Sequence, residues 1–550
     1  MISKKWKLII IGIDGVDWGL VQSFLRQGHL DNFNDFCQKG ISLMLESTIP
    51  PISPVAWTTL LSGLNPGKHG IYDWSVRKEG SYQFRLADSS CLNVPMFWDI
   101  LSAQGLSMTA FNFPLSYPPK KINGHMISGI LTPSTNADFT YPRQLAMELR
   151  SLGYRIGMQQ TYTAESEGIF YKDLMETLEL RLKTVRYLLE NHPQDAGAFL
   201  ISESDFAQHK FWKYLKDARK SDPQAPDNPI LEVYKRIDAF LGEISSSVDE
   251  DTNIVVLSDH GFCALKKVFC VNAWLAKHDF LVTKEGAFLK LRNRLDNFIS
   301  VPSLHSWINK LRLGRILTLI PKQSRNNLIK GLLSFDDVDW SKTSAYASGA
   351  LNQIYINLKG REPRGYVDVK QREEVLKKIE KAFSQLKDPV SGSNIKVKCM
   401  RAEDIYCGDK LKLAPDIHFN MDDYSYISTK RLSFKSAQTF RDSEYEDSGT
   451  HSPQGVFFAK GPNIAAGVSP NQGSKIEAIE VLPTLLYLLG AKIPRHLDGK
   501  INTSVIDGKK MVQRPPVYCS LGFSEKKGQK QPNKDPQAAE ERLRGLGYID

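Results

Sequence analysis

The N-terminal stretch that decides the fold reads Leu8-Ile9-Ile10-Ile11-Gly12-Ile13-Asp14-Gly15. From Leu8 to Ile13 every residue is apolar or glycine, as in a core strand that is covered on both faces. The apolar run then stops at a carboxylate, Asp14, and Gly15 lets the backbone turn beside a ligand. In open α/β sheets, ligands bind outside the carboxyl ends of the strands. The stretch therefore predicts a core strand that ends at a functional side chain, although an Asp in this place also serves as a helix cap.

Two further strand patterns also end close to carboxylates and imidazoles. Ala196–Ile201 leads to Asp205, and Ile254–Leu257 leads directly to Asp259-His260. Each of these strands follows a helical pattern, the first at about residues 172–190 and the second at about 229–246. This alternation predicts an α/β fold with a doubly wound, mainly parallel sheet flanked by helices.

The chain is long enough for more than one structural unit, with 550 residues. Several amphipathic basic segments interrupt the strand-helix pattern between residues 265 and 335. We therefore predict a first part of the α/β core over residues 1–264, a basic helical insert over 265–335, a second part of the core over 336–519, and a charged C-terminal tail over 520–550.

The positive charge of the chain is concentrated in this insert. Between residues 266 and 330, thirteen Lys or Arg stand against three acidic residues, which equals the net charge of +10 of the whole chain. Apolar residues such as Trp274, Trp307 and Leu311 recur among the cations. A basic amphipathic segment with Trp on its apolar side suits an anionic lipid interface, whereas a helical lid packed on the core is the duller alternative. We predict either an anionic membrane surface as a partner or a cap over the substrate site.

The apolar runs and the cysteines of the sequence indicate where the protein is expected in the cell. No apolar run approaches the ~20 residues that a membrane span needs, and the N-terminal apolar run is not followed by a signal-peptide cleavage site. The seven cysteines form an odd set without a C-x-x-C spacing, which favours reduced thiols. We expect a cytoplasmic protein that is soluble or peripheral at the membrane. No zinc finger or single-strand platform is recognisable, so a nucleic-acid partner is not expected.

Asp and His residues recur with the spacing of metal ligands. Asp205 and His209 are four residues apart, so on a helix they share one face and can bind one ion, although such pairs are also common on solvated surfaces. The Asp259-His260 pair at the mouth of a buried strand is more specific to metal ligation. His451, in a Gly-Thr-His loop, is uninformative by itself.

Ser53 lies between prolines, in Pro51-Ile52-Ser53-Pro54, just before a helical pattern that covers residues 56–64. It is either the cap of that helix or a hydroxyl presented to a phosphoryl group. Three Asp, three His and one Ser are the ligand types of a dinuclear zinc or manganese centre. Two metals about 4 Å apart stabilise both the attacking and the leaving oxygen of a phosphoryl transfer.

Three longer segments carry a resemblance to a known family. They are Ile49 to Ile71, Ser258-Asp259-His260-Gly261-Phe262, and Val481-Leu482-Pro483-Thr484 through Asp498-Gly499. In their order and spacing they resemble the alkaline phosphatase superfamily, and most closely its type I phosphodiesterase/nucleotide pyrophosphatase branch. The resemblance covers nearly the whole chain outside the basic insert and implies an alkaline-phosphatase-like fold.

The resemblance also implies a role for each residue of the motifs. Ser53 would be the nucleophile and would form a phosphoserine intermediate. One divalent metal, zinc or alternatively manganese, would be held by Asp205, His209 and His451. The second metal would be held by Asp14, Asp259, His260 and the Ser53 oxygen.

Asn112 is the one substrate-binding residue that we predict. The family uses a side-chain amide near its nucleophile to hold a non-bridging phosphate oxygen, and Ser53-Pro54-Val55-Ala56-Trp57 contains no Asn. Asn112, in Phe111-Asn112-Phe113-Pro114, is predicted to supply this donor from another loop.

The leading hypothesis is a metal-dependent phosphohydrolase that cleaves a phosphodiester or phosphomonoester of a small phosphorylated substrate. One alternative is a phosphomutase of the phosphoglycerate mutase type, which would need an inserted domain with acid-binding Arg and Lys around the site. The basic insert is short and amphipathic for that task. The other alternative is a non-catalytic binder of anionic surfaces, against which the seven competent ligand and nucleophile positions argue.

Overall fold

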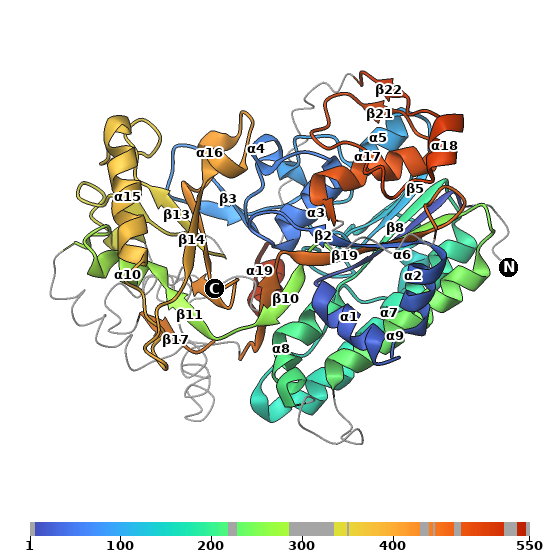
Figure 1. Cartoon of the computed structure of the whole chain (residues 1–550), viewed down its shortest axis with the longest axis horizontal. Helices are drawn as coiled ribbons and strands as arrows, with labels where there is room; N and C mark the ends of the chain where they lie inside the picture. Colours follow the sequence, from blue (N-terminus) through green and yellow to red (C-terminus); the bar gives the residue numbers. More distant parts are fainter. Residues whose placement is uncertain are drawn as a thin grey trace.

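We describe the protein from a computed structural model (Figure 1). The structure describes residues 6–217, 228–284, 335–348, 351–429, 439–443, 446–466, 475–521 and 536–545. Most of the predicted basic insert, residues 285–334, therefore lies outside the described residues, as does most of the predicted tail.

A nine-stranded sheet forms the centre of the larger part of the molecule. Its order is β20 (Lys475–Glu477), β2 (Ile41–Glu46), β19 (Gln454–Lys460), β9 (Asn253–Leu257), β1 (Leu8–Ile13), β8 (Ala196–Ile201), β5 (Met108–Phe111), β6 (Gly124–Ile127) and β7 (Thr140–Tyr141). The strand order leaves sequence order at almost every step, as crossover connections in a doubly wound sheet require. The predicted α/β class and mainly parallel sheet are confirmed.

Strand β1 lies inside this sheet because its residues can be covered on both faces. All six are buried, and β1 pairs in parallel with β8 on one side and β9 on the other. The register places Ile13 beside Ile201 and Gly12 beside Leu257, so the three strands end at the same edge. The antiparallel pairs are those of β19 with β2 and β9 and that of β7 with β6.

Helices cover both faces of the sheet (Figure 1). On one face lie the apolar helices α3 (Ser53–Ser62) and α17 (Ala478–Leu489), which pack against each other. On the other face lie the more amphipathic helices α1 (Trp18–Arg26), α2 (Asp31–Lys39), α7 (Glu167–Asn191), α8 (Glu203–Asp217) and α9 (Pro229–Ser247). Helix α3 is buried at every residue, so Ser53 begins a helix that has no solvent-exposed face.

A smaller unit with its own hydrophobic core stands beside the main sheet, at the left of Figure 1. One of its sheets has the order β12 (Ala345–Tyr346), β13 (Gln353–Ile356), β15 (Ile417–Met421) and β14 (Val397–Arg401), and another has the order β16 (Tyr426–Thr429), β11 (Lys267–Cys270) and β17 (Phe440–Arg441). Helices α10 (Val271–Lys277) and α15 (Arg372–Phe383) pack there, with Trp274 stacked on Phe383 at 4.4 Å between ring centroids.

The first residues of the predicted insert belong to this second core. Trp274 is 1% exposed, and Phe280 and Leu281 are also buried in the same cluster. These three apolar side chains therefore pack against protein and not against a lipid surface. The predicted domain division and the predicted contact of residues 265–335 with an anionic membrane remain predictions, because residues 285–334 lie outside the described part. In the described residues, no helix is long and apolar enough to cross a bilayer.

Candidate two-metal active site

Three neighbouring strands deliver three carboxylates to one edge of the sheet. Asp14 directly follows β1, and Asp259 lies two residues beyond the end of β9. Asp205 lies in the first turn of α8, which begins just after β8. All three side chains are buried, with exposed fractions of 4% or less. The fold thus brings together carboxylates that are up to 245 residues apart in the sequence. Because they are buried, solvent does little to screen the repulsion between their charges.

Ser53 is held at the first turn of α3, directly beside this cluster. Its Oγ donates to Asp14 Oδ1 at 3.2 Å and lies 3.3 Å from His260 Nε2. Pro54 follows Ser53 in the first turn, where the missing N–H of proline costs nothing and its fixed φ favours a helix. The positive end of the α3 dipole therefore points at the Ser53 side chain, and the same end favours an anion.

The ligand-type atoms form two groups that share His260. Asp14, Asp259 and His260 offer ligand atoms within 4.8 Å of one another, and so do Asp205, His260 and His451. His209 lies against the second group, with its Nε2 3.0 Å from His451 Nε2 and 3.6 Å from Asp205 Oδ2. All seven side chains predicted from the sequence as ligands or nucleophile thus converge in one place. The geometry adds that His260 lies between the two groups.

Hydrogen bonds fix the orientation of two of the imidazole rings. His260 Nδ1 lies 3.1 Å from Gly261 O, and His451 Nδ1 lies 3.0 Å from Pro51 O. A carbonyl oxygen only accepts, so Nδ1 carries a proton in both rings, and in a neutral ring Nε2 is then the nitrogen with the lone pair. The two rings are stacked at 3.8 Å between centroids. Both Nε2 atoms are therefore presented to the cluster in the form that binds a metal.

Strand β18 (Gly449–Ser452) carries His451 into the site from far along the chain. It pairs antiparallel with β10 (Gly261–Ala264), so that His451 lies opposite Phe262. Helix α8 holds the segment in front of β18, because Ser448 N donates to His209 O at 2.7 Å. The buried ion pair between Lys210 and Asp447, at 2.5 Å, strengthens the same contact. These contacts set the distance between His209 and His451.

Residues around the cluster hold its backbone in place. Ser258 Oγ donates to His260 O at 2.6 Å and accepts from Val16 N at 2.8 Å, which ties the end of β9 to the turn after β1. Gln208 Nε2 donates to Gly15 O at 2.7 Å and so anchors α8 to the same turn. Ser258 and Gln208 each stand one residue before a predicted ligand. Their hydrogen bonds therefore fix the position of the backbone that carries these ligands.

The burial of carboxylates and imidazoles next to one another shifts their pKa values. Burial raises the pKa of Asp14 well above its usual range, and the nearby Asp259 and Asp205 raise it further. Burial, with the charge of Asp205, raises the pKa of Asp259 to about 7. Burial also lowers the pKa of His260 well below that of a free imidazole. Asp259 Oδ2 is buried and accepts no hydrogen bond from the described residues. The donor set therefore fits divalent cations, which would neutralise the carboxylates and occupy this oxygen.

This electrostatic arrangement predicts how the metal-free protein responds to pH. Asp259 has a pKa of about 7 in the fold against 3.8 for a free carboxyl, so its contribution to stability is lost as the pH rises from about 4 through 7. We expect Asp259→Asn to raise the Tm of chelator-treated protein at pH 8 by a few degrees and at pH 5 by less than half as much. Thermal unfolding of both proteins at the two pH values measures this difference. An equal change at both pH values would contradict the assignment.

A small pocket beside Ser53 is lined by Trp74, Asn112, Ile130 and Phe206, among others. Asn112 thus lines the same pocket as Ser53, as its predicted role requires. Its Nδ2, however, donates to Leu200 O at 3.0 Å and faces Ser202 Oγ at 3.4 Å. The amide hydrogens of Asn112 are therefore directed at protein groups, and its contact with a substrate remains a prediction.

Three aromatic residues of the site were not predicted from the sequence. Trp57 Nε1 donates to Asp14 Oδ2 at 3.2 Å, so both oxygens of Asp14 have a donor. Its position four residues after Ser53 is a usable signal, because residues four apart share one face of a helix. Trp74 and Phe206 line the pocket, and nothing in their local sequence distinguishes them from core residues.

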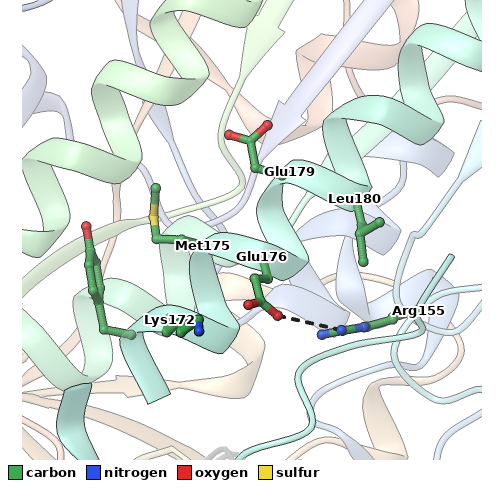
Figure 2. Close-up of a pocket in the computed structure, with 7 residues that line it drawn as sticks. Arg155, Lys172, Met175, Glu176, Glu179 and Leu180 are labelled. Carbon is green, nitrogen blue, oxygen red and sulfur yellow. Dashed lines mark ion pairs between the residues drawn. The ribbon is translucent and has the colours of Figure 1, made fainter. Parts of the chain in front are cut away.

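A second, more open pocket lies on the surface of α7 and shares no residue with this site. Figure 2 shows Arg155, from the loop before α7, reaching Glu176 on the helix, with 3.7 Å between their charged atoms. Arg155 also pairs with Asp173 at 3.0 Å. Its cation is thus already balanced by carboxylates of the same helix.

The sequence matches the model of one protein family, and the structure is similar to solved structures. The model of the type I phosphodiesterase/nucleotide pyrophosphatase family matches residues 8–454. A structure of an inactive form of mouse ectonucleotide pyrophosphatase/phosphodiesterase 5 in complex with AMP is 13% identical, with a TM-score of 0.48, and the match covers 89% of this chain and 96% of that one. The human protein of the same name is 12% identical with a TM-score of 0.48, and the match covers 92% and 100% of the two chains. No curated protein matches the sequence.

Proposed function

Because the chain belongs to the type I phosphodiesterase/nucleotide pyrophosphatase family, we propose that it hydrolyses phosphodiesters with Ser53 as nucleophile and two divalent metal ions as cofactors. The observation that carries this proposal is the position of Ser53 Oγ, within 3.3 Å of both a carboxylate oxygen of Asp14 and the Nε2 of His260. A hydroxyl in this position, at the first turn of a buried helix, is the group that a bound phosphoryl would meet first.

The residues that would hold the ions follow from the donor atoms. Asp205, His209 and His451 would hold one ion, and Asp14, Asp259, His260 and the Ser53 oxygen the other, with His260 close enough to the first group to contact either. When bound, the ions would stabilise the Ser53 alkoxide and the developing charge on the leaving oxygen. Carboxylate and imidazole ligands suit zinc, with manganese as the alternative.

The proposed reaction proceeds by two displacements at phosphorus. Ser53 Oγ loses its proton to solvent water and forms a bond to phosphorus, and the first alcohol leaves as its alkoxide and takes up a proton from water, which leaves a phosphoserine diester. A water molecule then attacks the same phosphorus, the bond to Ser53 Oγ breaks, one proton of the water returns to Ser53 Oγ, and a phosphomonoester leaves as product. Asp14 Oδ1, which accepts the hydrogen bond of the resting hydroxyl, orients Ser53 Oγ for the first displacement.

The charge of the pocket favours diesters over monoesters. Trp74, Ile130 and Phe206 present apolar surface beside Ser53, and no Lys or Arg belongs to the described residues that line this pocket. Beyond the two metal ions, a monoester dianion would gain no cationic side chain there, whereas the apolar second substituent of a diester would gain contact surface.

We therefore expect kcat/KM for bis-p-nitrophenyl phosphate to exceed that for p-nitrophenyl phosphate by at least about tenfold, which corresponds to ~1.4 kcal/mol of transition-state binding. Release of p-nitrophenol from each substrate by the zinc-loaded protein measures the ratio. A ratio below one would reverse the assignment and favour a monoesterase.

A phosphomutase would return the phosphoryl group to its substrate and release none. Incubation with a ³²P-labelled diester therefore separates the two enzyme classes, because only a hydrolase releases the label as a new monoester. Absence of turnover with every ester, together with loaded metal, would leave the non-catalytic reading.

A further inference from the structure

A helix near the C-terminus joins the structure beside the candidate active site. Helix α19 (Pro536–Gly545) buries Ala539 and Leu543, which are both fully covered and belong to the main hydrophobic core. Figure 1 shows α19, in dark red near the middle of the view, well away from α18 (Gly508–Gln513), the helix that precedes it in the described chain. The helix lies beyond residues 8–454, the range that the family model matches.

Arg542 of this helix binds three backbone carbonyls of a single loop. Its Nη1 donates to Ile130 O at 2.6 Å and to Thr132 O at 2.7 Å, and its Nη2 donates to Pro133 O at 3.0 Å. The loop supplies no carboxylate to this guanidinium in these contacts. The guanidinium holds its N–H donors in a fixed planar fork, so it can bind three carbonyl oxygens of one loop at once. The ammonium group of a lysine has no such fork.

The same loop forms a wall of the pocket beside Ser53. Ile130 lines that pocket, and the inner side of the loop rests on the backbone that follows β5, because a Cβ at Gly129 would lie 2.3 Å from Phe113 O. Thr132 closes the turn, with its Oγ1 donating to Gly129 O at 2.7 Å. The loop is thus held from inside by the β5 connection and from outside by Arg542.

We propose that Arg542 is a positioning residue that fixes Ile130 as the pocket wall next to Ser53, and that α19 thereby holds the surface against which an ester substituent packs. The proposal rests on the proposed function, since it assigns the substrate to the pocket of Ser53. Among the described residues, Arg542 donates to the carbonyl groups of Ile130, Thr132 and Pro133, and none of its hydrogen bonds goes to Ser53 or to a proposed metal ligand. Its effect on the reaction must therefore pass through the loop.

The test compares Arg542→Ala with Arg514→Ala in the full-length, zinc-loaded protein. Arg514 is a matched control, because its Nη2 also donates to a carbonyl, Tyr487 O, at 2.8 Å, and neither residue lines the pocket. We expect Arg542→Ala to raise KM for bis-p-nitrophenyl phosphate about tenfold, with kcat changed less than about threefold and metal content unchanged. Arg514→Ala should leave both constants near those of the unmodified protein.

A double-mutant cycle with Ile130→Ala tests whether the effect passes through the pocket wall. If Arg542 acts by fixing Ile130, the Arg542→Ala/Ile130→Ala protein should lose hardly more kcat/KM than Ile130→Ala alone. A merely structural role of Arg542 would instead lower Tm and give losses that add. Arg542→Lys, which keeps the charge but not the fork, should retain only part of the effect of Arg542 and carries the test if the Ala variant does not fold.

Each outcome has a distinct meaning. Kinetic constants of Arg542→Ala that match those of Arg514→Ala, or additive losses in the cycle, would overturn the positioning role. An active Ser53→Ala protein would instead overturn the proposed function, whatever Arg542 does. The failure of one hypothesis is thus distinguishable from the failure of the other.

Discussion

Ser53→Ala is expected to lower kcat for bis-p-nitrophenyl phosphate by about 10⁴- to 10⁶-fold, the range seen when a nucleophile of covalent catalysis is removed. The Ser53 side chain is 2% exposed and its Oγ contacts Asp14 and His260. Ala keeps the helix but offers no oxygen to phosphorus. Metal content should stay close to that of the unmodified protein, because the carboxylates and imidazoles remain.

Thr58→Ala is the matched control for this variant. Thr58 is a buried hydroxyl on the same helix, and its Oγ1 donates to Pro54 O at 2.6 Å and not to the cluster. It should lower Tm slightly and keep kcat within a few-fold. Acid quenching during turnover, followed by mass spectrometry, should place a phosphoryl adduct on Ser53. Near-normal turnover by Ser53→Ala would remove Ser53 from the mechanism.

His451→Ala is expected to remove one of two bound metals per chain and to lower kcat/KM by about 10²-fold or more, since one side of the transition state loses its stabilisation. His451 belongs to only one of the two ligand groups, whereas His260 belongs to both. The Asp14, Asp259 and His260 group should thus keep its ion with reduced affinity. Metal analysis by mass spectrometry after gel filtration gives the stoichiometry.

His69→Ala is the control for this second variant. His69 is equally buried, but its Nε2 lies 3.0 Å from Thr59 Oγ1 and its Nδ1 accepts from Ile71 N, outside both ligand groups. It should bind both metals if it folds. Loss of both metals from His451→Ala, or of neither, would show that the ions are partitioned differently from the proposal.

Much of the fold could be predicted because its strands are simple. The predicted strands Leu8–Ile13 and Ala196–Ile201 have the bounds found in the structure, since continuous apolar runs mark strands covered on both faces. The helix predicted from Ala56 begins at Ser53, because Pro54 is favoured in a first turn and disfavoured inside a helix. The predicted family resemblance is confirmed by the match to residues 8–454.

The arrangement of the site was harder to predict than its members. Spacing identified Asp205 with His209 and Asp259 with His260, because these pairs are local. It did not reveal that His260 stacks on His451 or that Nδ1 of His451 binds Pro51 O. These contacts depend on the pairing of β10 with β18, which only the tertiary fold determines. The surroundings of Trp274 stayed open for a similar reason, since a Trp among lysines has the same pattern whether a lipid or a second core covers it.

The position of β19 between two earlier strands affects how the protein folds while it is being synthesised. Strand β19 lies between β2 and β9, so two strands made early have no common neighbour until residue 460 has left the ribosome. Until then β9 keeps one row of backbone groups unpaired, which invites association with other chains. His451 reaches the site in the same late step, because β18 directly precedes β19. Between the synthesis of Leu257 and that of Lys460, which is more than one-third of the chain, the nascent protein thus has an unpaired sheet edge and an incomplete ligand set, and the site is completed only when β19 joins the sheet.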